Sequence, residues 1–270
     1  MIRRTAKRIL RRRFGWLPLY ELRNKVLLAH TVPGNWLFET REVHRLRKLL
    51  PDVAPSLVTT VIPTYKRADA LRAAVESALS QTIADNRVII VDDGGGQIPP
   101  LPEDPRVVAV SLRRNTAVAG VVRNVGVRLA SSPFVAFLDD DNLWEPEHLA
   151  TALAALEARP KDRSYRLDGV YTALRRVTPD GREMDILSVP YDRRLAREKS
   201  FFDTNAFVAR RNRALRFSRL RRHKDVMPRE DWVLLYRYAR HHRIAHIPVP
   251  TVRYLVNPNT YYTVWDRSLD

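Results

Sequence analysis

Three clusters of polar residues each follow a short apolar run, and their residue types suit a phosphate-bearing ligand. Residues 63–67 (PTYKR) offer an aromatic ring and two cations after the run 57–62. Residues 92–96 (DDGGG) offer two carboxylates and glycines that let a ligand approach the backbone. Residues 139–141 are three aspartates, which repel one another unless water or a hard divalent cation such as Mg²⁺ or Mn²⁺ neutralises them. Each cluster alone also fits a turn or an acidic surface, but their succession favours a site for a nucleotide and a metal.

The elements that must position these clusters follow an α/β pattern. Four runs rich in apolar and β-branched residues are typical of buried parallel strands: 57–62, 87–91, 107–110 and 134–138. Apolar residues at helical spacing predict helices over 69–81, which Asp69 would cap, and over 118–130. The alternation predicts a Rossmann-like, mostly parallel sheet flanked by helices. Ligands of such sheets bind beyond the carboxyl ends of the strands, where this chain carries its acids.

Composition excludes several classes of protein. The 270 residues include 47 Lys and Arg, 30 Asp and Glu and no cysteine, which excludes a disulfide framework, a zinc–thiolate site and a thiol nucleophile. We find no signal peptide and no apolar run near the ~20 residues that a membrane span needs. The sequence therefore predicts a soluble, cytoplasmic, globular protein with a basic balance.

The net charge of +17 is concentrated in two patches. Residues 1–50 hold 13 cations and three acids, and residues 210–224 hold eight cations and no acid, so the remainder is close to neutral. Within residues 1–17, arginines recur at helical spacing and aromatics follow, as in a basic amphipathic helix. Such a helix would either bind an anionic membrane surface, placing the protein peripherally at the inner face, or pack on the body with its arginines solvated. Pro33-Gly34 is expected to break this segment, which leaves a basic helical extension, 1–55, before a main domain, 56–270.

Four motifs in order resemble those of the inverting family 2 glycosyltransferases, which have the GT-A fold. They are residues 61–67 (VIPTYKR), 91–94 (VDDG), 123–126 (RNVG) and 137–141 (FLDDD). The resemblance covers roughly residues 56–265 and implies a nucleotide-binding half, 56–142, followed by an acceptor half, 143–270.

The resemblance also implies roles for single residues of the first half. The nucleotide site would comprise Pro63, Thr64, Tyr65, Arg67, Asp93, Arg123, Asp139 and Asp140. Tyr65 is expected beside the base, Asp93 on the base and Asp140 near the ribose. Asp141, with Asp139, would bind Mn²⁺ or Mg²⁺ at the family's D-x-D signature. A metal on the donor diphosphate neutralises the charge that develops on the leaving nucleotide.

The second half contains a segment, 227–232 (MPREDW), that resembles the family's Glu-Asp motif. By that resemblance Asp231 would deprotonate the acceptor hydroxyl, and Glu230 and Trp232 would lie at the acceptor. Acids in the first turn of a helix are also favoured by the helix dipole alone. One base suffices because an inverting transfer is a single displacement.

The tail segment 254–260 (YLVNPNT) departs from the family pattern. The family often places a metal-binding histidine where this chain has Asn257, which offers a weaker carbonyl oxygen. Two arrangements remain open at this point. Either Asn257 binds the metal, or Asp141, phosphates and water hold it.

The sequence thus predicts a metal-dependent inverting glycosyltransferase that uses a nucleotide-sugar donor. A UDP-sugar is the default donor, with GDP and dTDP left open, and the acceptor is a glycan, a lipid-linked glycan or a small molecule. The basic patches would attract an anionic or membrane-associated acceptor. A nucleotidyltransferase is the alternative, although residues 63–67 lack the glycines that such enzymes place after the first strand. A nucleic-acid-binding protein is the second alternative, disfavoured by the acids at the strand ends, and no nucleic acid is expected as a partner.

Overall fold

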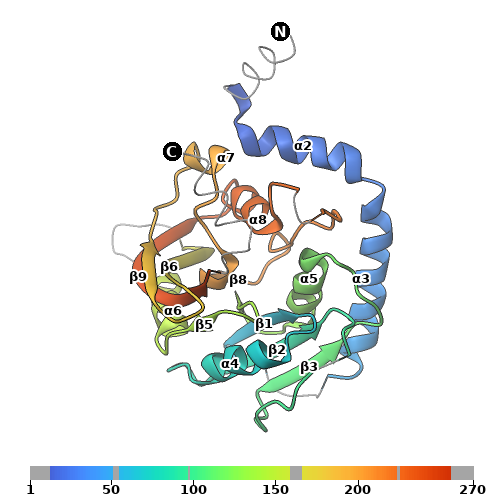
Figure 1. Ribbon diagram of the computed structural model, residues 1–270, viewed down its shortest axis with the longest axis vertical. Helices are drawn as coiled ribbons and strands as arrows, with labels where there is room; N and C mark the ends of the chain where they lie inside the picture. The colour runs from blue at the N-terminus through green and yellow to red at the C-terminus, as the bar shows by residue number, and fades with distance from the viewer. Residues whose placement is uncertain (1–12, 51–54, 97, 159–165, 224–225, 257–270) are drawn as a thin grey trace.

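The computed structural model describes residues 13–50, 55–96, 98–158, 166–223 and 226–256. A nine-stranded sheet forms its centre (Figure 1). One strand, β7 (Glu183–Leu187), pairs with β6 (Gly169–Val177) and lies outside the main strand order. The other strands lie in the order β3 (Val107–Ser111), β2 (Asn86–Asp92), β1 (Val58–Thr64), β4 (Phe134–Phe137), β8 (Phe207–Arg210), β6, β9 (Ile244–Leu255) and β5 (Leu143–Trp144). This arrangement confirms the predicted α/β class.

The first four strands are parallel, as predicted. β1 pairs with β2 up to Thr64↔Asp92 and with β4 up to Val61↔Phe137. β1 therefore runs past Pro63, beyond the predicted strand, because β2 still pairs with it there. The helix α4 (Ala68–Leu79) follows, with Asp69 in its first turn and Arg67, not Asp69, at its N-cap.

Helices cover both faces of this parallel part. Along β2, Val88 and Ile90 belong to one hydrophobic cluster with α4, while Ile89 and Val91 belong to another with α5 (Ala119–Leu129). Neighbouring strand residues point to opposite faces, so a fully apolar strand requires a helical layer on each side. Gly126 lets α5 approach β1, because a Cβ at this position would lie 2.3 Å from Val61 Cγ1.

The second half of the sheet is mixed, but the sheet as a whole is mostly parallel, as predicted, because only β5, β7 and β8 run against the direction of the other strands. β8 is antiparallel to both β4 and β6, β6 is parallel to β9, and β5 is antiparallel to β9. β8 begins beside the carboxyl end of β4, directly after the 3₁₀ turn η1 (Thr204–Ala206), and therefore runs back along β4. The helices α6 (His148–Glu157), α7 (Leu195–Glu198) and α8 (Glu230–Tyr238) complete this half.

The N-terminal segment forms two helices, α2 (Trp16–Leu28) and α3 (Thr31–Arg47). The predicted break at Pro33-Gly34 is wrong in position, since α3 runs through both residues. A proline lacks the N–H that would bond to the carbonyl four residues earlier, so the helix breaks at Ala29 and Pro33 sits in the first turn of α3. In Figure 1, α2 crosses above α8 and α3 runs down one side of the sheet. None of the helices in the described ranges is both long and apolar enough to cross a membrane.

Two arginines of the second basic patch, 210–224, form ion pairs with these two helices. Arg219 donates two hydrogen bonds of 2.6 Å to buried Glu39 of α3. Arg222 donates one of 2.6 Å to Glu21 of α2. Arg210 and Arg211 instead bond to backbone carbonyls. Two arginines of the patch therefore tie the N-terminal helices to the body, while Arg211, Arg213, Arg216 and Arg221 are exposed.

Candidate active site

The aspartates that follow β4 meet the polar residues that follow β1. The hydroxyl of Thr64 donates a 2.7 Å hydrogen bond to Asp140 Oδ2, and Arg67 Nη1 lies 3.2 Å from Asp140 Oδ1. The same guanidinium nitrogen also pairs with Asp141. Parallel pairing of β1 with β4 brings the two strand ends together, as the sequence predicted.

This concentration of negative charge alters proton affinities. Burial raises the pKa of Asp140 to about 6, with Asp139 and Asp141 adding to the rise, although Thr64 and Arg67 oppose it. Burial and the charge of Asp139 also raise the pKa of Asp141. A cation bound beside these carboxylates would relieve the repulsion.

Arg123 joins this cluster to the Glu-Asp motif of α8. Its guanidinium donates one hydrogen bond to Asp139 and another, of 3.0 Å, to Glu230 Oε1. Only 7% of the Arg123 side chain is exposed. Burial alone would lower the pKa of Arg123, but Asp139 and Glu230 outweigh it and raise that pKa well above its usual value. The two motifs are 89 residues or more apart in sequence, and Arg123 on α5 links them directly.

Asp231 lies beside Glu230 in the first turn of α8 and is buried. Its Oδ1 accepts a 2.7 Å hydrogen bond from the backbone N–H of Trp232. Its charge contributes to the raised pKa of Arg123 and of Asp203, which places it at the same cluster. The predicted base is therefore brought together with the predicted metal ligands.

Trp232 has the contacts of a packing residue. It is buried, stacks on Trp16 with ring centroids 5.3 Å apart, and donates a 2.8 Å hydrogen bond from Nε1 to the carbonyl of Ala196. These contacts show that Trp232 anchors α8 beneath α2. The contact of Trp232 with the acceptor stays a prediction.

Sequence reasoning missed two polar residues at the cluster. Asn205 of η1 is fully buried, accepts from the backbone N–H of Asp139 at 2.6 Å and donates to Asp139 Oδ2 at 3.1 Å. Asp203, which accepts from Asn205, has a pKa raised to about 7 by burial and by Asp139 and Asp231. The only signal in the sequence is the Asp-x-Asn spacing, which is also typical of an ordinary turn.

Tyr254 of β9 is a third residue near the acids. Burial, followed by the charges of Asp203, Asp139 and Asp231, raises the pKa of its hydroxyl well above the usual value. It therefore remains a neutral phenol at neutral pH. Asn257, three residues further on, lies outside the described residues.

The predicted binding site for the base of the nucleotide lies at the carboxyl end of β2. Asp93 is buried and accepts hydrogen bonds of 2.9 and 3.1 Å from the backbone N–H groups of Thr116 and Ala117. Burial raises the pKa of Asp93 despite these hydrogen bonds. Tyr65 is exposed, with the Lys66 ammonium 5.4 Å from its ring centroid. The structure thus fixes Asp93 through the loop after β3 and leaves the ring of Tyr65 accessible.

The residues present fit a divalent metal that is shared with a phosphate ligand. Within the described ranges, no group of three or more His, Cys, Asp or Glu residues could enclose a metal ion. Mg²⁺ does not need such a cage, because it usually takes one or two carboxylates and completes its shell with phosphates and water. Asp141 has a partly exposed carboxylate with a raised pKa, and its charged partner, Arg67, is itself exposed. Asp139 is more constrained, since both of its oxygens accept hydrogen bonds.

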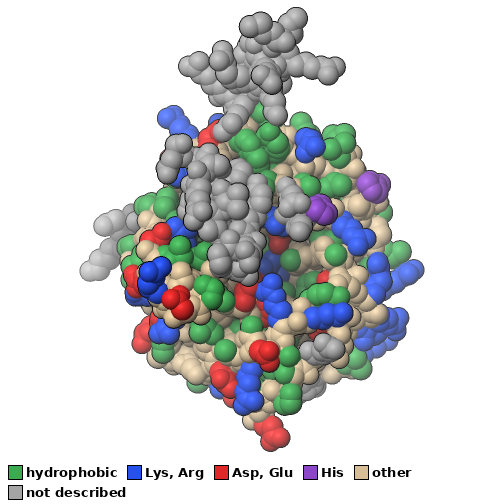
Figure 2. Space-filling model, viewed as in Figure 1, with side chains coloured by type: hydrophobic (Ala, Val, Ile, Leu, Met, Phe, Trp, Pro, Cys, Tyr) green, Lys and Arg blue, Asp and Glu red, His purple; other side chains and the backbone are tan. Residues whose placement is uncertain are grey.

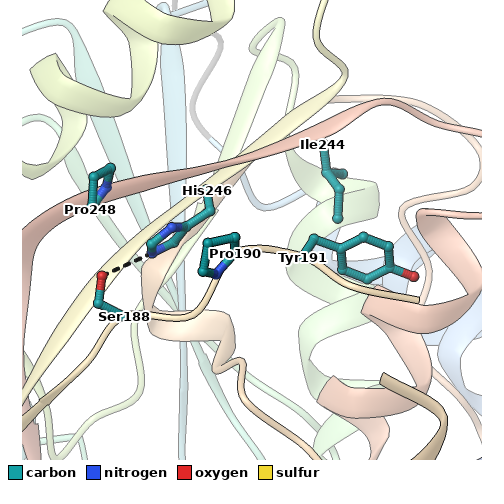
Figure 3. Close-up of a pocket in the computed structure, with 6 residues that line it drawn as sticks. All are labelled: Ser188, Pro190, Tyr191, Ile244, His246 and Pro248. Carbon is teal, nitrogen blue, oxygen red and sulfur yellow. Dashed lines mark hydrogen bonds between the residues drawn. The ribbon is translucent and has the colours of Figure 1, made fainter. Parts of the chain in front are cut away.

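A separate pocket lies beside β9 and the segment that follows β7. It is lined by Ser188, Pro190, Tyr191, Ile244, His246 and Pro248, and Figure 3 shows the Ser188 hydroxyl pointing toward the His246 ring. The Ser188 Oγ and His246 Nε2 atoms are 3.3 Å apart, and burial lowers the pKa of His246. None of the six lining residues belongs to the acid cluster.

Comparison with known proteins agrees with this geometry. The profile of glycosyl transferase family 2 matches residues 59–223. The uncharacterized glycosyltransferase YwdF of Bacillus subtilis is 27% identical over 218 residues, which cover 73% of each chain. The succinoglycan biosynthesis protein ExoW of Rhizobium meliloti is 35% identical over 107 residues, but these span only 34% of its length and 37% of this chain.

Solved structures show the same fold at low identity. The structure of S. aureus TarS 1-349 in complex with UDP-GlcNAc has a TM-score of 0.55, with 16% identity over 76% of this chain and 60% of that one. The mannosyltransferase PcManGT from Pyrobaculum calidifontis, in complex with GDP-Man and Mn²⁺, has a TM-score of 0.50, with 17% identity over 90% of this chain and 71% of that one.

The curled α/β sheet and the acids at its strand ends therefore define a GT-A glycosyltransferase. The chain belongs to glycosyl transferase family 2. This membership confirms the resemblance seen in the sequence and decides against the nucleotidyltransferase and nucleic-acid-binding alternatives.

Proposed function

We propose that this glycosyltransferase is metal-dependent and inverting, and moves a sugar from a nucleotide-sugar donor, by preference a UDP-sugar, to an acceptor hydroxyl. The observation that carries the proposal is the Asp139–Arg123–Glu230 link. It holds the D-x-D aspartates, which suit a donor diphosphate and its metal, next to the Glu-Asp motif, which supplies a base. A donor on one side and a deprotonated hydroxyl on the other are the two requirements of a single displacement.

In this proposal Asp231 is the general base. The acceptor's hydroxyl proton passes to its carboxylate while the acceptor oxygen bonds to the anomeric carbon of the donor sugar. The bond from that carbon to the donor phosphate breaks, and the nucleoside diphosphate leaves with the electron pair. Glu230, fixed by Arg123, orients the start of α8 so that Asp231 faces the acids after β4.

The donor contacts are assigned to residues of the first half. Tyr65 stacks on the base and Asp93 reads it, while Asp140 lies near the ribose. Pro63 and Thr64 shape the end of β1, where Thr64 fixes Asp140. Arg67 pairs with Asp140 and Asp141 but is 55% exposed, so its side chain can move to a phosphate.

Asp141 and Asp139 would hold Mn²⁺ or Mg²⁺, with Asn257 as a further ligand. Such an ion, when bound, supplies positive charge that stabilises the leaving diphosphate. The neighbour PcManGT was solved with Mn²⁺, which supports the choice of metal.

The acceptor is proposed to be a glycan or a lipid-linked glycan. One relative, 31% identical over 113 residues, is the Escherichia coli protein WfaP, named a UDP-Glc:alpha-D-GlcNAc-diphosphoundecaprenol beta-1,3-glucosyltransferase. Those residues span 45% of WfaP and 40% of this chain, so the name supports only the acceptor class. A cytoplasmic enzyme with residues 1–17 at the inner face of the membrane would reach such an acceptor.

A panel of nucleotide sugars with Mn²⁺ or Mg²⁺ tests the proposal, scored by thermal shift and by release of nucleoside diphosphate. We expect at least one UDP-sugar to raise Tm only when metal is present, and failure of every nucleotide sugar to bind would refute the donor assignment. Asp231→Asn should keep that shift but lower transfer by at least about 100-fold, the usual contribution of a general base. Asp180→Asn, in the exposed turn between β6 and β7, is the control and should transfer normally.

A further inference from the structure

The two N-terminal helices carry polar residues on their buried side and apolar residues on their exposed side. Glu21 and Asn24 of α2 and Asn35 and Glu39 of α3 are buried against the body. The large apolar side chains that these helices and the segment just before α2 expose are Phe14, Leu22, Val26, Leu27, Trp36 and Leu37. Leu17 at the start of α2 and Val43 and Leu46 at the end of α3 are also buried. Only over residues 21–39 is the pattern therefore the reverse of an ordinary surface helix, whose apolar side faces the core.

Specific hydrogen bonds fix this inverted orientation. Asn24 Nδ2 donates to the carbonyl of Met227 at 2.8 Å, and Asn35 Nδ2 donates to the carbonyl of Arg219 at 2.8 Å. Glu21 and Glu39 are ion-paired with Arg222 and Arg219. Rotation of either helix to bury its apolar side would break these bonds and leave buried polar groups without partners, which is costly. The apolar residues are therefore held outward.

The outward apolar residues gather around the corner where α2 meets α3. Leu22 and Val26, four residues apart on α2, are 61% and 72% exposed, and Trp36 in the second turn of α3 is 53% exposed. Each helix rises about 1.5 Å per residue, so all three lie within about 12 Å of the corner, measured along their helices. Figure 2 shows hydrophobic and cationic side chains side by side over α2.

The charges around this face are all of one sign. Within residues 13–50, the three acids are Glu21, Glu39 and Glu42, and all three are buried and ion-paired. Arg23, Lys25 and Arg41 are exposed in the same helices. The outward surface of α2 and α3 thus combines aliphatic side chains, a tryptophan and cations, with no carboxylate among the described residues.

We propose that this outward face, Leu22, Val26, Leu27, Trp36 and Leu37 with Arg23 and Lys25, docks on the surface of an anionic lipid bilayer. Aliphatic side chains enter the boundary of the acyl chains, tryptophan prefers the headgroup level, and cations are attracted to anionic lipids. A second copy of the chain would bring like charges together on this face, which disfavours self-association. The face differs from residues 1–12, which lie outside the described residues, and the proposal does not depend on the proposed reaction.

Docking there would also orient the catalytic end of the enzyme. Trp16 at the start of α2 stacks on Trp232, the residue that follows Asp231. Arg222 and Arg219, which pair with α2 and α3, belong to the segment that leads into α8. A bilayer that holds the two helices would therefore hold α8 at a fixed height above the lipid surface, which suits an acceptor anchored in that surface.

Vesicle co-sedimentation of the full chain tests the proposal. The probes are vesicles with 30% phosphatidylglycerol in phosphatidylcholine and vesicles of phosphatidylcholine alone. We expect wild type to bind the anionic vesicles, and the variant L22S/V26S/W36S, which keeps every cation, to bind them at least about tenfold more weakly. The control M184S/I186S/V249S removes three exposed apolar side chains of β7 and β9 and should bind like wild type. Because all six side chains are exposed, both variants should keep the Tm of wild type.

A second variant tests the electrostatic part of the proposal. R23Q/K25Q should weaken binding to the anionic vesicles by about fivefold per cation and leave binding to neutral vesicles unchanged. Equal binding by wild type and L22S/V26S/W36S would overturn the proposal, as would failure of wild type to bind anionic vesicles. A dimer in light scattering that L22S/V26S/W36S abolishes would also overturn it, since a second copy would then cover the face. Vesicle binding needs no donor, so its outcome is separate from that of the transfer assay.

Discussion

Replacing Arg123 by methionine should destabilise the fold and disconnect the two halves of the site. The substitution keeps much of the side-chain volume but leaves Asp139 and Glu230 without their cation. Removing one partner of a buried ion pair costs about 3–5 kcal/mol. The two carboxylate side chains keep 25% and 21% of their surface exposed, and Asp139 retains Asn205, so we expect the lower end, about 3 kcal/mol. For a chain of this size that lowers Tm by roughly 6–12 °C.

A double-mutant cycle with Glu230→Gln separates stability from function. In Arg123→Met/Glu230→Gln one unpaired charge is removed, so part of the lost stability should return, while metal-dependent donor binding and transfer should not. Denaturant unfolding gives the free energies, and thermal shift with a UDP-sugar and Mn²⁺ reports donor binding. Arg72→Met is the control, because Arg72 pairs with Glu76 on the surface of α4, and should change stability by less than about 0.5 kcal/mol. A loss below about 1 kcal/mol for Arg123→Met, or full additivity in the cycle, would show that the link is not the buried ion pair described here.

Three further substitutions test other parts of the structure. His148 is fully buried, and burial lowers its pKa to about 3, so the unfolded chain binds a proton below pH 6.5 that the folded chain does not. The free energy of unfolding of wild type should therefore fall by up to about 1.4 kcal/mol per pH unit through this group as pH falls from 6.5 towards 3. In His148→Gln the free energy of unfolding should fall less steeply over the same pH range, and equal slopes for the two proteins would contradict this. Gly126→Ala should cost about 1–3 kcal/mol because its Cβ would meet Val61, whereas the control Gly34→Ala, with open space around it, should gain up to about 1 kcal/mol in the same urea titration. Asp141→Ala should abolish the metal dependence of donor binding in calorimetry, and an unchanged dependence would move the metal elsewhere.

The sequence predicted the first half of the fold well, because local signals determine it. β1, β2 and β4 are short apolar runs with both faces buried, and β3 is a partly exposed apolar strand at the edge of the sheet. Polar residues follow β1, β2 and β4, and a parallel sheet must place them at one edge. The second half lacked such signals. β8 has four residues, and its antiparallel direction depends on where η1 leaves it beside β4.

The sequence predicted the site residues that follow directly after strands. It missed residues that reach the site from distant segments of the chain. Asp140 and Asp141 follow β4, so their proximity to Arg67 after β1 follows from parallel pairing. Asn205 reaches Asp139 from 66 residues away, and no local pattern distinguishes it from an ordinary turn residue. The Arg219–Glu39 pair spans 180 residues, so nothing in the sequence indicated that Arg219 of the basic patch holds α3 against the body.

The two arginines at the acid cluster, Arg123 and Arg67, differ in their exposure and therefore in the roles they can have. Arg123 is 7% exposed and hydrogen-bonded to Asp139 and Glu230, so moving it would leave these two partly buried carboxylates without their counter-charge. Arg67 is 55% exposed and pairs with Asp140 and Asp141, whose side chains are 8% and 36% exposed, so only its pair with Asp141 is an exposed ion pair worth about 0–1 kcal/mol. Arg67 can therefore leave these aspartates at little cost when another cation takes its place, and its planar guanidinium is then free to bind a donor phosphate. Arg123 keeps the base and the D-x-D aspartates together throughout. The sequence placed both residues in the nucleotide site, but only burial separates the fixed cation from the exchangeable one.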